Sequence, residues 1–312
     1  KEKGIAIMIV NHKLDEIYRI ADRLTILRNG TYISSGDISE YDQARFTKDM
    51  TGRDIVETKY TPEESGEEVL RVEHLSRKGA FEDVSFTLHK GDVLGITGLL
   101  GSGRGEIGEA LFGIAPAESG KIFLNGKEIE IKSVKDAMTN EIGYVPEDRL
   151  TQGLFMERSI QDNVIAASIR KYMKGGKLDE KEMEDTTNYW IKEIEIKAPS
   201  PKPAVRTLSG GNAQKVVIAK WLNTNPKLFI LDGPTVGVDI GAKAEIHEIL
   251  HGLAKKGVGI IIISDDLPEL VQNCNKIVVM RDGKLSGSMD NSIDERTLGN
   301  ILVGATKGGA KE

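Results

Sequence analysis

The chain has 312 residues, 39% of them hydrophobic and 29% charged, which is the composition of a globular protein with enough apolar material for one or two domains. Its net charge of −6, without a long basic stretch, argues against nucleic-acid binding. A single cysteine, Cys274, excludes an intrachain disulfide framework and is typical of a reducing compartment.

Residues 4–31 and 257–284 form an internal repeat that aligns without a gap. Each copy predicts a buried strand, a short helix, and a second strand that ends at a glycine turn. Seven pairs of identical residues carry the alignment: Gly4 and Gly257, Ile7 and Ile260, Ile9 and Ile262, Leu14 and Leu267, Glu16 and Glu269, Arg28 and Arg281, Gly30 and Gly283.

The two copies are separated by the length of one large domain. We therefore expect residues 1–56 to be the end of a first domain and residues 69–305 to be a whole second domain. The chain also begins inside a strand-like pattern, GIAIMIV, without an initiator Met, so we expect it to be a piece of a longer protein. Residues 57–68 are polar and acidic and predict a linker, and residues 306–312 predict a flexible tail.

After the linker, apolar residues alternate at Val84, Phe86 and Leu88, and a turn follows at Lys90-Gly91. This pattern predicts an antiparallel β-unit that leads into the buried strand DVLGITG. Further along, helices are expected at 178–195, 209–224 and 241–256, and apolar strands at 227–231 and 258–263. The alternation indicates an α/β fold with a largely parallel sheet.

A glycine-rich loop, GLLGSGRGE, follows the first of these buried strands. Its spacing is that of the phosphate-binding pattern G-x-x-x-x-G-K-[ST], in which backbone amides surround phosphate oxygens. The candidate nucleotide-binding residues are Gly98, Leu99, Leu100, Gly101, Ser102, Gly103, Arg104, Gly105 and Glu106. A dinucleotide pattern, G-x-G-x-x-G, overlaps it, but the next stretch predicts a hairpin around Asn125-Gly126 rather than a βαβ unit.

A second glycine loop, LSGGN, begins a predicted helix, and the apolar strand LFILD ends at Asp232 twenty residues later. An acid at the carboxyl end of a strand beside a phosphate loop can hold Mg²⁺ directly or through water. Together, LSGGNAQK, LDGPTVGVD, YVPEDR and the phosphate loop resemble the second nucleotide-binding domain of the ATP-binding-cassette (ABC) proteins that drive bacterial simple-sugar importers. The resemblance covers essentially the whole chain.

The resemblance implies a P-loop NTPase fold of the ABC type, with a largely parallel core sheet, an antiparallel β-subdomain and a helical subdomain at about residues 147–205. Two such domains pair head to tail, and each ATP lies between the P-loop of one domain and the signature motif of the other. The resemblance assigns the signature and interdomain-loop contacts with nucleotide to Leu208, Ser209, Gly210, Gly211, Asn212, Gln214 and Asp239. It also implies Mg²⁺ at Asp232 and Glu147, and a switch histidine of the first domain at His12.

Several positions depart from the family pattern. Arg104 replaces the P-loop lysine, and Gly105 lacks the hydroxyl that ligates Mg²⁺. Gly233 stands where the general-base glutamate belongs, a loss that typically costs ~10²–10⁴-fold in rate. The repeat aligns Asp265 with His12, and an acid there is expected to repel a γ-phosphate. No clear aromatic precedes Phe81 to stack on adenine. The second domain is therefore expected to be degenerate, with this chain alone inactive.

The resemblance also implies partners: a missing N-terminal nucleotide-binding domain, integral membrane permease subunits and, indirectly, a periplasmic or surface solute-binding protein, with the subunit peripheral on the cytoplasmic face of the membrane. Simple sugars are the expected cargo; nucleosides or other small polar solutes are alternatives. Two other functions stay open, a non-catalytic regulatory pseudo-ATPase and a soluble cassette acting on nucleic acid or ribosomes, which the acidic linker disfavours. One set of apolar residues either faces the permease or forms core: Leu154, Phe155, Met156, Ile160, Val164 and Ile165.

Overall fold

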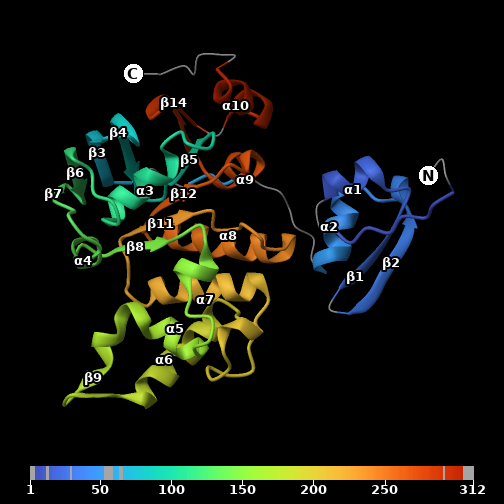
Figure 1. Cartoon of the computed structure of the whole chain (residues 1–312), viewed down its shortest axis with the longest axis horizontal. Coiled ribbons are helices and arrows are strands. Elements are labelled where there is room, and N and C mark those ends of the chain that lie inside the picture. The colour runs from blue at the N-terminus through green and yellow to red at the C-terminus, as the bar shows by residue number, and fades with distance from the viewer. Residues whose placement is uncertain are drawn as a thin grey trace. The chain divides into compact units, whose positions relative to one another are not determined.

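The computed structural model divides the chain into two compact units, which Figure 1 shows. The first comprises residues 1–57 with 238–245, and the second residues 58–237 with 246–312. The structure describes residues 4–11, 14–28, 30–52, 59–62, 66–290 and 292–304. The tail expected at residues 306–312 lies outside these ranges, and the linker expected at 57–68 lies partly outside them.

The first unit contains one antiparallel hairpin and two helices. Its elements are α1 (Leu14–Ile20), β1 (Arg23–Arg28), β2 (Thr31–Asp37), the 3₁₀ turn η1 (Ile38–Glu40) and α2 (Gln43–Thr51). A small core of Leu24, Ile26, Tyr41 and Phe46 holds them together. The helix expected from residue 14 and the strand that follows it are confirmed, while Asn29 of the expected turn lies outside the described residues.

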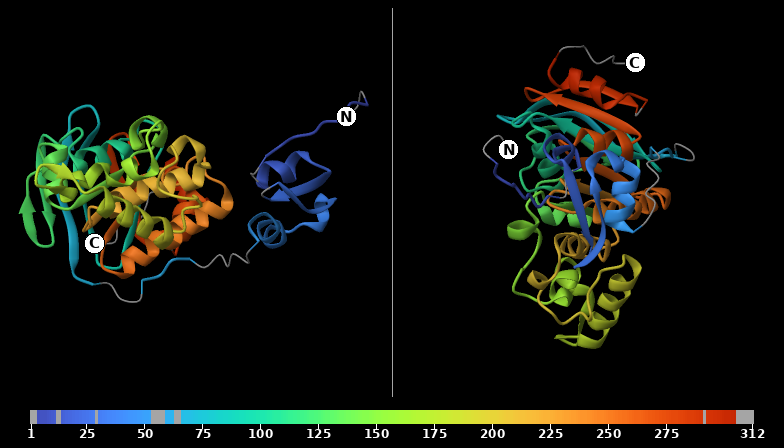
Figure 2. Two further views of the ribbon diagram at one scale, coloured as in Figure 1. Left: turned by 90° about the horizontal axis from the view of Figure 1, so that it is seen from below. Right: turned by 90° about the vertical axis from the view of Figure 1, so that its right-hand side faces the viewer.

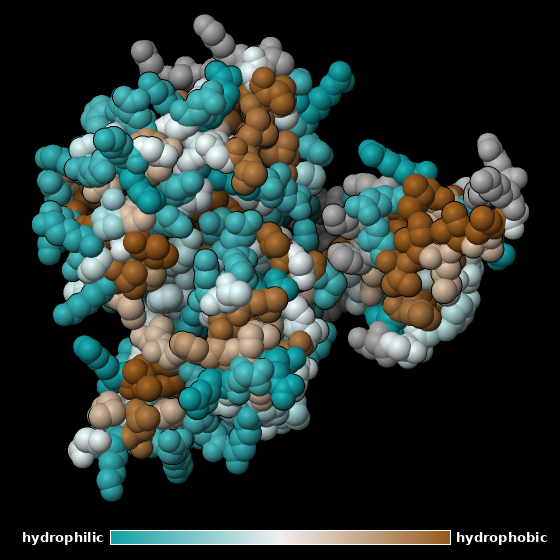
Figure 3. Space-filling model, viewed as in Figure 1, coloured by the Kyte–Doolittle hydropathy of each residue, from teal (hydrophilic) through white to brown (hydrophobic). Residues whose placement is uncertain are grey.

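The strand expected at residues 4–10 is not formed. These residues belong to no strand, and the side chains of Ile5, Ile7, Met8, Ile9 and Val10 are between 56% and 94% exposed. Their counterpart in the repeat is a fully buried strand that pairs with a neighbour on each side. A segment this apolar forms a buried strand only between neighbouring strands, and the described part of the first unit holds only the β1–β2 pair. Figure 3 shows apolar side chains gathered on one face of this unit.

The second unit is built on a six-stranded sheet with the order β14-β13-β5-β12-β11-β8. All neighbours are parallel except β14, which runs antiparallel to β13 at one edge. The strands are β5 (Val93–Gly98), β8 (Ile142–Val145), β11 (Leu228–Asp232), β12 (Gly259–Ile263), β13 (Lys276–Arg281) and β14 (Lys284–Asp290). Continuous runs such as GIIII suit strands that are covered on both faces, and the expected parallel sheet is confirmed. The helices that follow strands of this sheet are α3 (Arg104–Phe112), α8 (Ile240–Lys255), α9 (Leu267–Asn273) and α10 (Glu295–Leu302), and α4 (Val134–Thr139) precedes β8.

A separate antiparallel sheet has the order β4-β3-β6-β7, as the alternating pattern predicts. Its strands are β3 (Glu68–Arg77), β4 (Phe81–His89), β6 (Ser119–Leu124) and β7 (Lys127–Ile129). The alternating residues Val84, Phe86 and Leu88 are all buried, and the hairpin turn at Asn125-Gly126 is confirmed.

A helical region lies at one end of the second unit, green to yellow in Figures 1 and 2, away from β14 and α10. Its elements are the π-helical turn η2 (Arg149–Gly153), α5 (Ile160–Ile165), the 3₁₀ segment η3 (Ala166–Tyr172), the short pair β9 (Met173–Lys174) and β10 (Lys177–Leu178), α6 (Glu180–Glu193), the 3₁₀ turn η4 (Val205–Thr207) and α7 (Gly210–Leu222). Among the described residues, no helix is both long and apolar enough to cross a bilayer.

Candidate nucleotide site and signature motif

The glycine-rich loop joins the carboxyl end of β5 to the start of α3, where a phosphate loop belongs. Gly103 caps α3 with φ 92°, and a Cβ there would lie 2.5 Å from the carbonyl oxygen of Ala80, so only glycine fits. The hydroxyl of Ser102 is buried and has no hydrogen-bond partner in the described part of the chain. An orphaned buried donor inside a loop of this shape suits a phosphate oxygen.

Arg104 does not project freely from this loop. Its Nη1 donates a hydrogen bond to the carbonyl oxygen of Gly98, and its Nη2 lies 3.4 Å from Oδ2 of Asp265. The arginine side chain is 16% exposed, while that of Asp265 is 74% exposed. The acid that was expected only to repel a phosphate is therefore also the ion-pair partner of the P-loop cation.

Asp232 ends β11, with β12 between it and β5, at the same carboxyl edge of the sheet. Burial and the charge of Glu147 raise the pKa of its carboxyl to about 7, although Arg104 opposes the shift. The hydroxyl of Tyr144 lies 3.5 Å from Oδ2. A Cβ on Gly105 would lie 3.3 Å from the same oxygen, so a serine or threonine hydroxyl would fit beside the carboxylate.

Two features of this edge bear on the Mg²⁺ that was expected at Asp232 and Glu147. Residue 105 has no hydroxyl, and burial raises the pKa of the Asp232 carboxyl. No group of three or more His, Cys, Asp or Glu in the described ranges is arranged to hold a metal ion. The assignment of Mg²⁺ to Asp232 and Glu147 stays a prediction.

The backbone conformation and the close neighbours of residue 233 favour glycine at this position. Its φ is +55°, and a Cβ would lie 2.9 Å from Cγ2 of Val236 and 3.2 Å from Cγ of Glu147. Its amide donates to the carbonyl oxygen of Ile263 at 2.8 Å. A glutamate at this position would meet strain and the side chain of Glu147.

The signature segment begins α7 in the helical region. Ser209 is the N-cap residue, exposed, and its hydroxyl accepts a hydrogen bond from Nδ2 of Asn212 at 2.8 Å. Among the described residues, no side chain caps the first amides of α7, which is the arrangement that anion sites at helix starts require. Gln214 is 2% exposed and presents almost no surface to a ligand. No described hydrogen bond joins residues 208–214 to the P-loop residues 98–106.

Comparison with known proteins agrees with this arrangement. The profile of the ABC transporter family matches residues 81–236, a span that includes both the P-loop and the signature. The chain belongs to the ABC transporter family. A nucleotide-free ATP-binding cassette from an ABC transporter covers 76% of the chain and 95% of its own length, with a TM-score of 0.64 and 24% identity, and so shares the fold.

Two curated relatives of this ABC cassette align over nearly the whole chain. One is a putative ribose/galactose/methyl galactoside import ATP-binding protein of Rhizobium etli, 40% identical over 99% of the chain. The other is the ribose import ATP-binding protein RbsA of Lacticaseibacillus paracasei, 40% identical over 100% of the chain. The chain spans 59% and 62% of the lengths of these two relatives.

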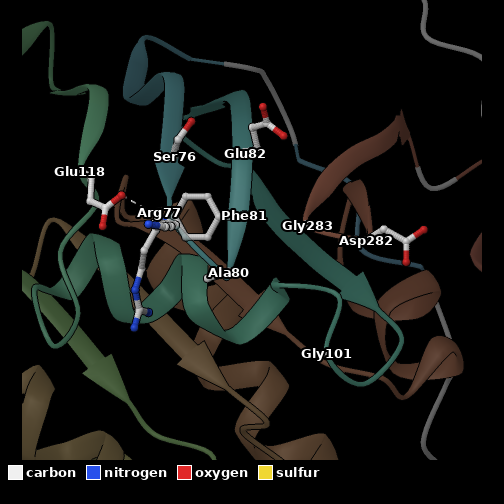
Figure 4. A pocket seen from close by; sticks show the side chains of 11 residues that line it. Ser76, Arg77, Ala80, Phe81, Glu82, Gly101, Glu118, Asp282 and Gly283 are labelled. Carbon is white, nitrogen blue, oxygen red and sulfur yellow. Dashed lines mark hydrogen bonds between the residues drawn. The ribbon is translucent and has the colours of Figure 1, made fainter.

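A pocket of about 460 Å³ lies beside the P-loop of the ABC cassette, where Gly101, Gly283 and the turn between β3 and β4 meet (Figure 4). Phe81 is 3% exposed, so its ring offers no free face for an adenine base. The wall is mainly polar and charged, with Arg77, Glu82 and Glu118 contributing. Phe81 lines the pocket, and whether an aromatic ring stacks on adenine stays a prediction.

Other expected site residues fall in different places. Asp239 is exposed, and its carboxylate accepts the amide of Ala242 at 3.0 Å, which caps the start of α8. Glu147 is exposed beside Gly233. His12 lies outside the described residues.

The apolar set of the helical region is mostly core. Leu154, Ile160, Val164 and Ile165 are no more than 6% exposed, and only Phe155, at 62%, is prominent on the surface. The expectation that these apolar residues form a surface facing the permease is therefore wrong for these four residues.

A buried network behind the site was missed. The carboxylate of Glu269 accepts hydrogen bonds from Thr235 (2.6 Å) and Ser264 (2.7 Å), and His247 Nε2 lies 2.9 Å from it. Burial alone would raise the pKa of Glu269, but these partners hold it at about 2. The network fixes the ends of β11 and β12 together. The recurrence of Glu16 as Glu269 was the one sequence signal for it.

Proposed function

We propose that this chain carries the second nucleotide-binding domain, and the end of the first, of an ATP-driven importer of a simple sugar. The support is the alignment with ribose and galactose import ATP-binding proteins over nearly the whole chain. The observation that carries the proposal is an asymmetry. The signature start is exposed with an uncapped helix end, whereas the P-loop cation is already engaged by Asp265.

Residues 1–56 are proposed to complete a first domain whose P-loop is not part of this chain. Residues 5–10 support this, because they are exposed here while their repeat counterpart is the central strand β12. In that domain His12 is proposed as the switch histidine. Residues 57–68 are proposed as the linker between the two domains.

In the complete subunit, the signature of the second domain is proposed to face the ATP bound by the first. The amides at the start of α7 and the hydroxyl of Ser209 would then meet the γ-phosphate, where negative charge develops during hydrolysis. Asp239 would lie in the loop between the domains. Bound ATP holds the domains together, and its hydrolysis releases them.

That motion is proposed to reach integral membrane permease subunits from the cytoplasmic face of the membrane, with a solute-binding protein supplying the sugar on the other side. Glu147 and the exposed Phe155 are the candidates for transmitting it. Mg²⁺ would be held at the first domain's site, where it neutralises phosphate charge. Nucleosides or other small polar solutes are alternative cargoes.

A non-catalytic regulatory function is the second candidate. The left-handed backbone at Gly233, where a glutamate side chain would be crowded, favours this function for the nucleotide site of the second domain. Steady-state ATPase of the full-length subunit separates the two. Ser209→Ala is expected to lower turnover at least ~100-fold, the size of effect seen when one donor to a developing oxyanion is lost. Arg104→Ala is expected to keep most of the ATPase turnover of the full-length subunit. This chain alone should show negligible turnover. Unchanged turnover in Ser209→Ala contradicts the proposal.

A further inference from the structure

Arg149 lies at the start of the π-helical turn η2, which follows the end of β8. The turn is anchored by Asp148, whose carboxylate accepts the amides of Leu150 (3.0 Å) and Thr151 (3.2 Å). From this anchored backbone the guanidinium of Arg149 reaches the loop that follows β11. Its Nη1 donates to the carbonyl oxygen of Val236, and its Nη2 donates to that of Gly237 at 3.2 Å.

The same guanidinium lies against the first residue of the signature helix. A Cβ on Gly210 would lie 3.0 Å from Nη2 of Arg149 and 3.0 Å from the carbonyl oxygen of Gly237. The start of α7, the arginine and the loop after β11 thus meet at one point. Only a residue without a side chain lets the helix start approach both partners so closely.

The other end of η2 contacts α7 nearer to the carboxyl end of that helix. The carbonyl oxygen of Gly153 accepts a hydrogen bond from Nζ of Lys220 at 2.6 Å, and a Cβ on Gly153 would lie 3.3 Å from Cγ2 of Val217. Lys220 is only 8% exposed. The described hydrogen bonds therefore join the π-helical turn to α7 through Gly153 and to the loop 233–237 through Arg149.

We infer that Arg149 is a positioning residue that locks the signature start to the loop 233–237, so that both move together with α7. The inference rests on the proposed function in one respect, that the signature acts on a bound nucleotide. A planar guanidinium with several donors suits two adjacent carbonyl oxygens, which a single ammonium does not match. When Arg149 is removed, the two segments keep their direct approach at Gly210 and Gly237 but lose the guanidinium that lies against both, while each keeps its own helix or turn.

Hydrogen exchange on this chain tests the link directly. Arg149→Ala is expected to raise amide exchange about tenfold both in residues 209–213 and in residues 233–237. The loop loses two hydrogen bonds to a charged group, and the helix start loses the guanidinium that lies against Gly210. Arg149→Lys should give a smaller rise in both. Exchange in the buried strand β12 should not change. The control is Arg206→Ala, which removes an exposed pair with Glu157 at 2.9 Å in the same helical region and should change neither segment.

A second variant decides the matter if Arg149→Ala does not fold. Gly210→Ala places a methyl group against the guanidinium and should loosen the same two segments together. Exchange that rises in only one segment, or in neither, overturns the inference.

In the full-length subunit, Arg149→Ala should lower kcat about tenfold or more with little change in KM for ATP, and Arg149→Lys should recover part of the loss. If the exchange result holds while Ser209→Ala leaves ATPase intact, the proposed function fails and the mechanical link stands. If Ser209→Ala abolishes turnover while Arg149→Ala leaves amide exchange unchanged, the proposed function stands and the mechanical link fails.

Discussion

The carboxylate of Asp265 lies 3.4 Å from the guanidinium of Arg104, which joins the residue that the repeat aligns with His12 to the cation of the glycine-rich loop. Two departures from the family pattern are therefore one feature of the structure. A positive P-loop side chain that already has an anionic partner is less available to phosphate, and the partner's charge opposes a polyphosphate. The pair is largely open to solvent on the aspartate side, so its own contribution to stability is small, about 0–1 kcal/mol.

Asp265→Asn is expected to tighten the binding of ATP to this chain by about threefold to tenfold, because it removes a negative charge and frees Arg104. The free energy of unfolding should change by less than about 1 kcal/mol. Calorimetric titration at low and high salt measures the affinity, and the gain should shrink at high salt. Glu157→Gln, in the helical region, is the control. An affinity for ATP that stays the same in Asp265→Asn would show that the pair does not restrain the loop.

Gly233→Glu is not expected to restore a working base. The left-handed backbone and the contacts with Val236 and Glu147 should lower the free energy of unfolding by about 1–3 kcal/mol. Denaturant unfolding measures this. Gly252→Glu is the matched control, since nothing lies within 4 Å of a Cβ there and the position is inside α8, where glutamate is favoured over glycine. Equal stability of the two variants would refute the argument.

Asp232 should make the second unit less stable as pH rises. Its pKa is raised to about 7 in the folded state, above its value of about 3.9 when unfolded. Between these two values the folded state binds more protons, so this group's contribution to stability falls from pH 4 to pH 7 and is constant above that. Asp232→Asn removes the dependence. The stability of the wild type relative to Asp232→Asn should therefore fall between pH 4 and pH 7 and level off above that. A difference that is flat, or that grows with pH, would contradict the assignment.

Glu269→Gln should destabilise the chain by about 3 kcal/mol or more, because the buried partners His247, Thr235 and Ser264 lose their anionic acceptor. The pKa of about 2 means that the stability from Glu269 is present above its unfolded pKa, near 4.3, and is lost as pH falls toward 2. Urea unfolding at pH 7 and pH 3 checks both statements. The exposed Glu248→Gln serves as control and should stay within about 0.5 kcal/mol of the wild type.

Much of the second unit could be predicted from local patterns. Apolar runs such as LFILD and GIIII mark buried parallel strands, and the turns at Lys90-Gly91 and Asn125-Gly126 mark the ends of antiparallel strands. The segment GIAIMIV shows the limit of such patterns. Its sequence is that of a central strand, but a strand also needs neighbours, and none pairs with it among the residues that the structure describes.

The candidate site was only partly predictable. The glycine loop and Asp232 are recognisable from spacing, because each follows a strand whose carboxyl end lies at one edge of the sheet. The Arg104–Asp265 pair joins residues that are distant in sequence, and Arg149 acts on carbonyl oxygens, which carry no sequence signal. Contacts of both kinds require the fold.

Vanadate trapping of a photoreactive ATP analogue in the full-length subunit, followed by peptide mapping, tests the asymmetric account most directly. The account predicts that trapped label is recovered from the P-loop of the first domain, that peptides containing residues 98–106 carry almost none, and that Ser209→Ala abolishes trapping. Equal label in peptides containing residues 98–106, or trapping that survives Ser209→Ala, would contradict it.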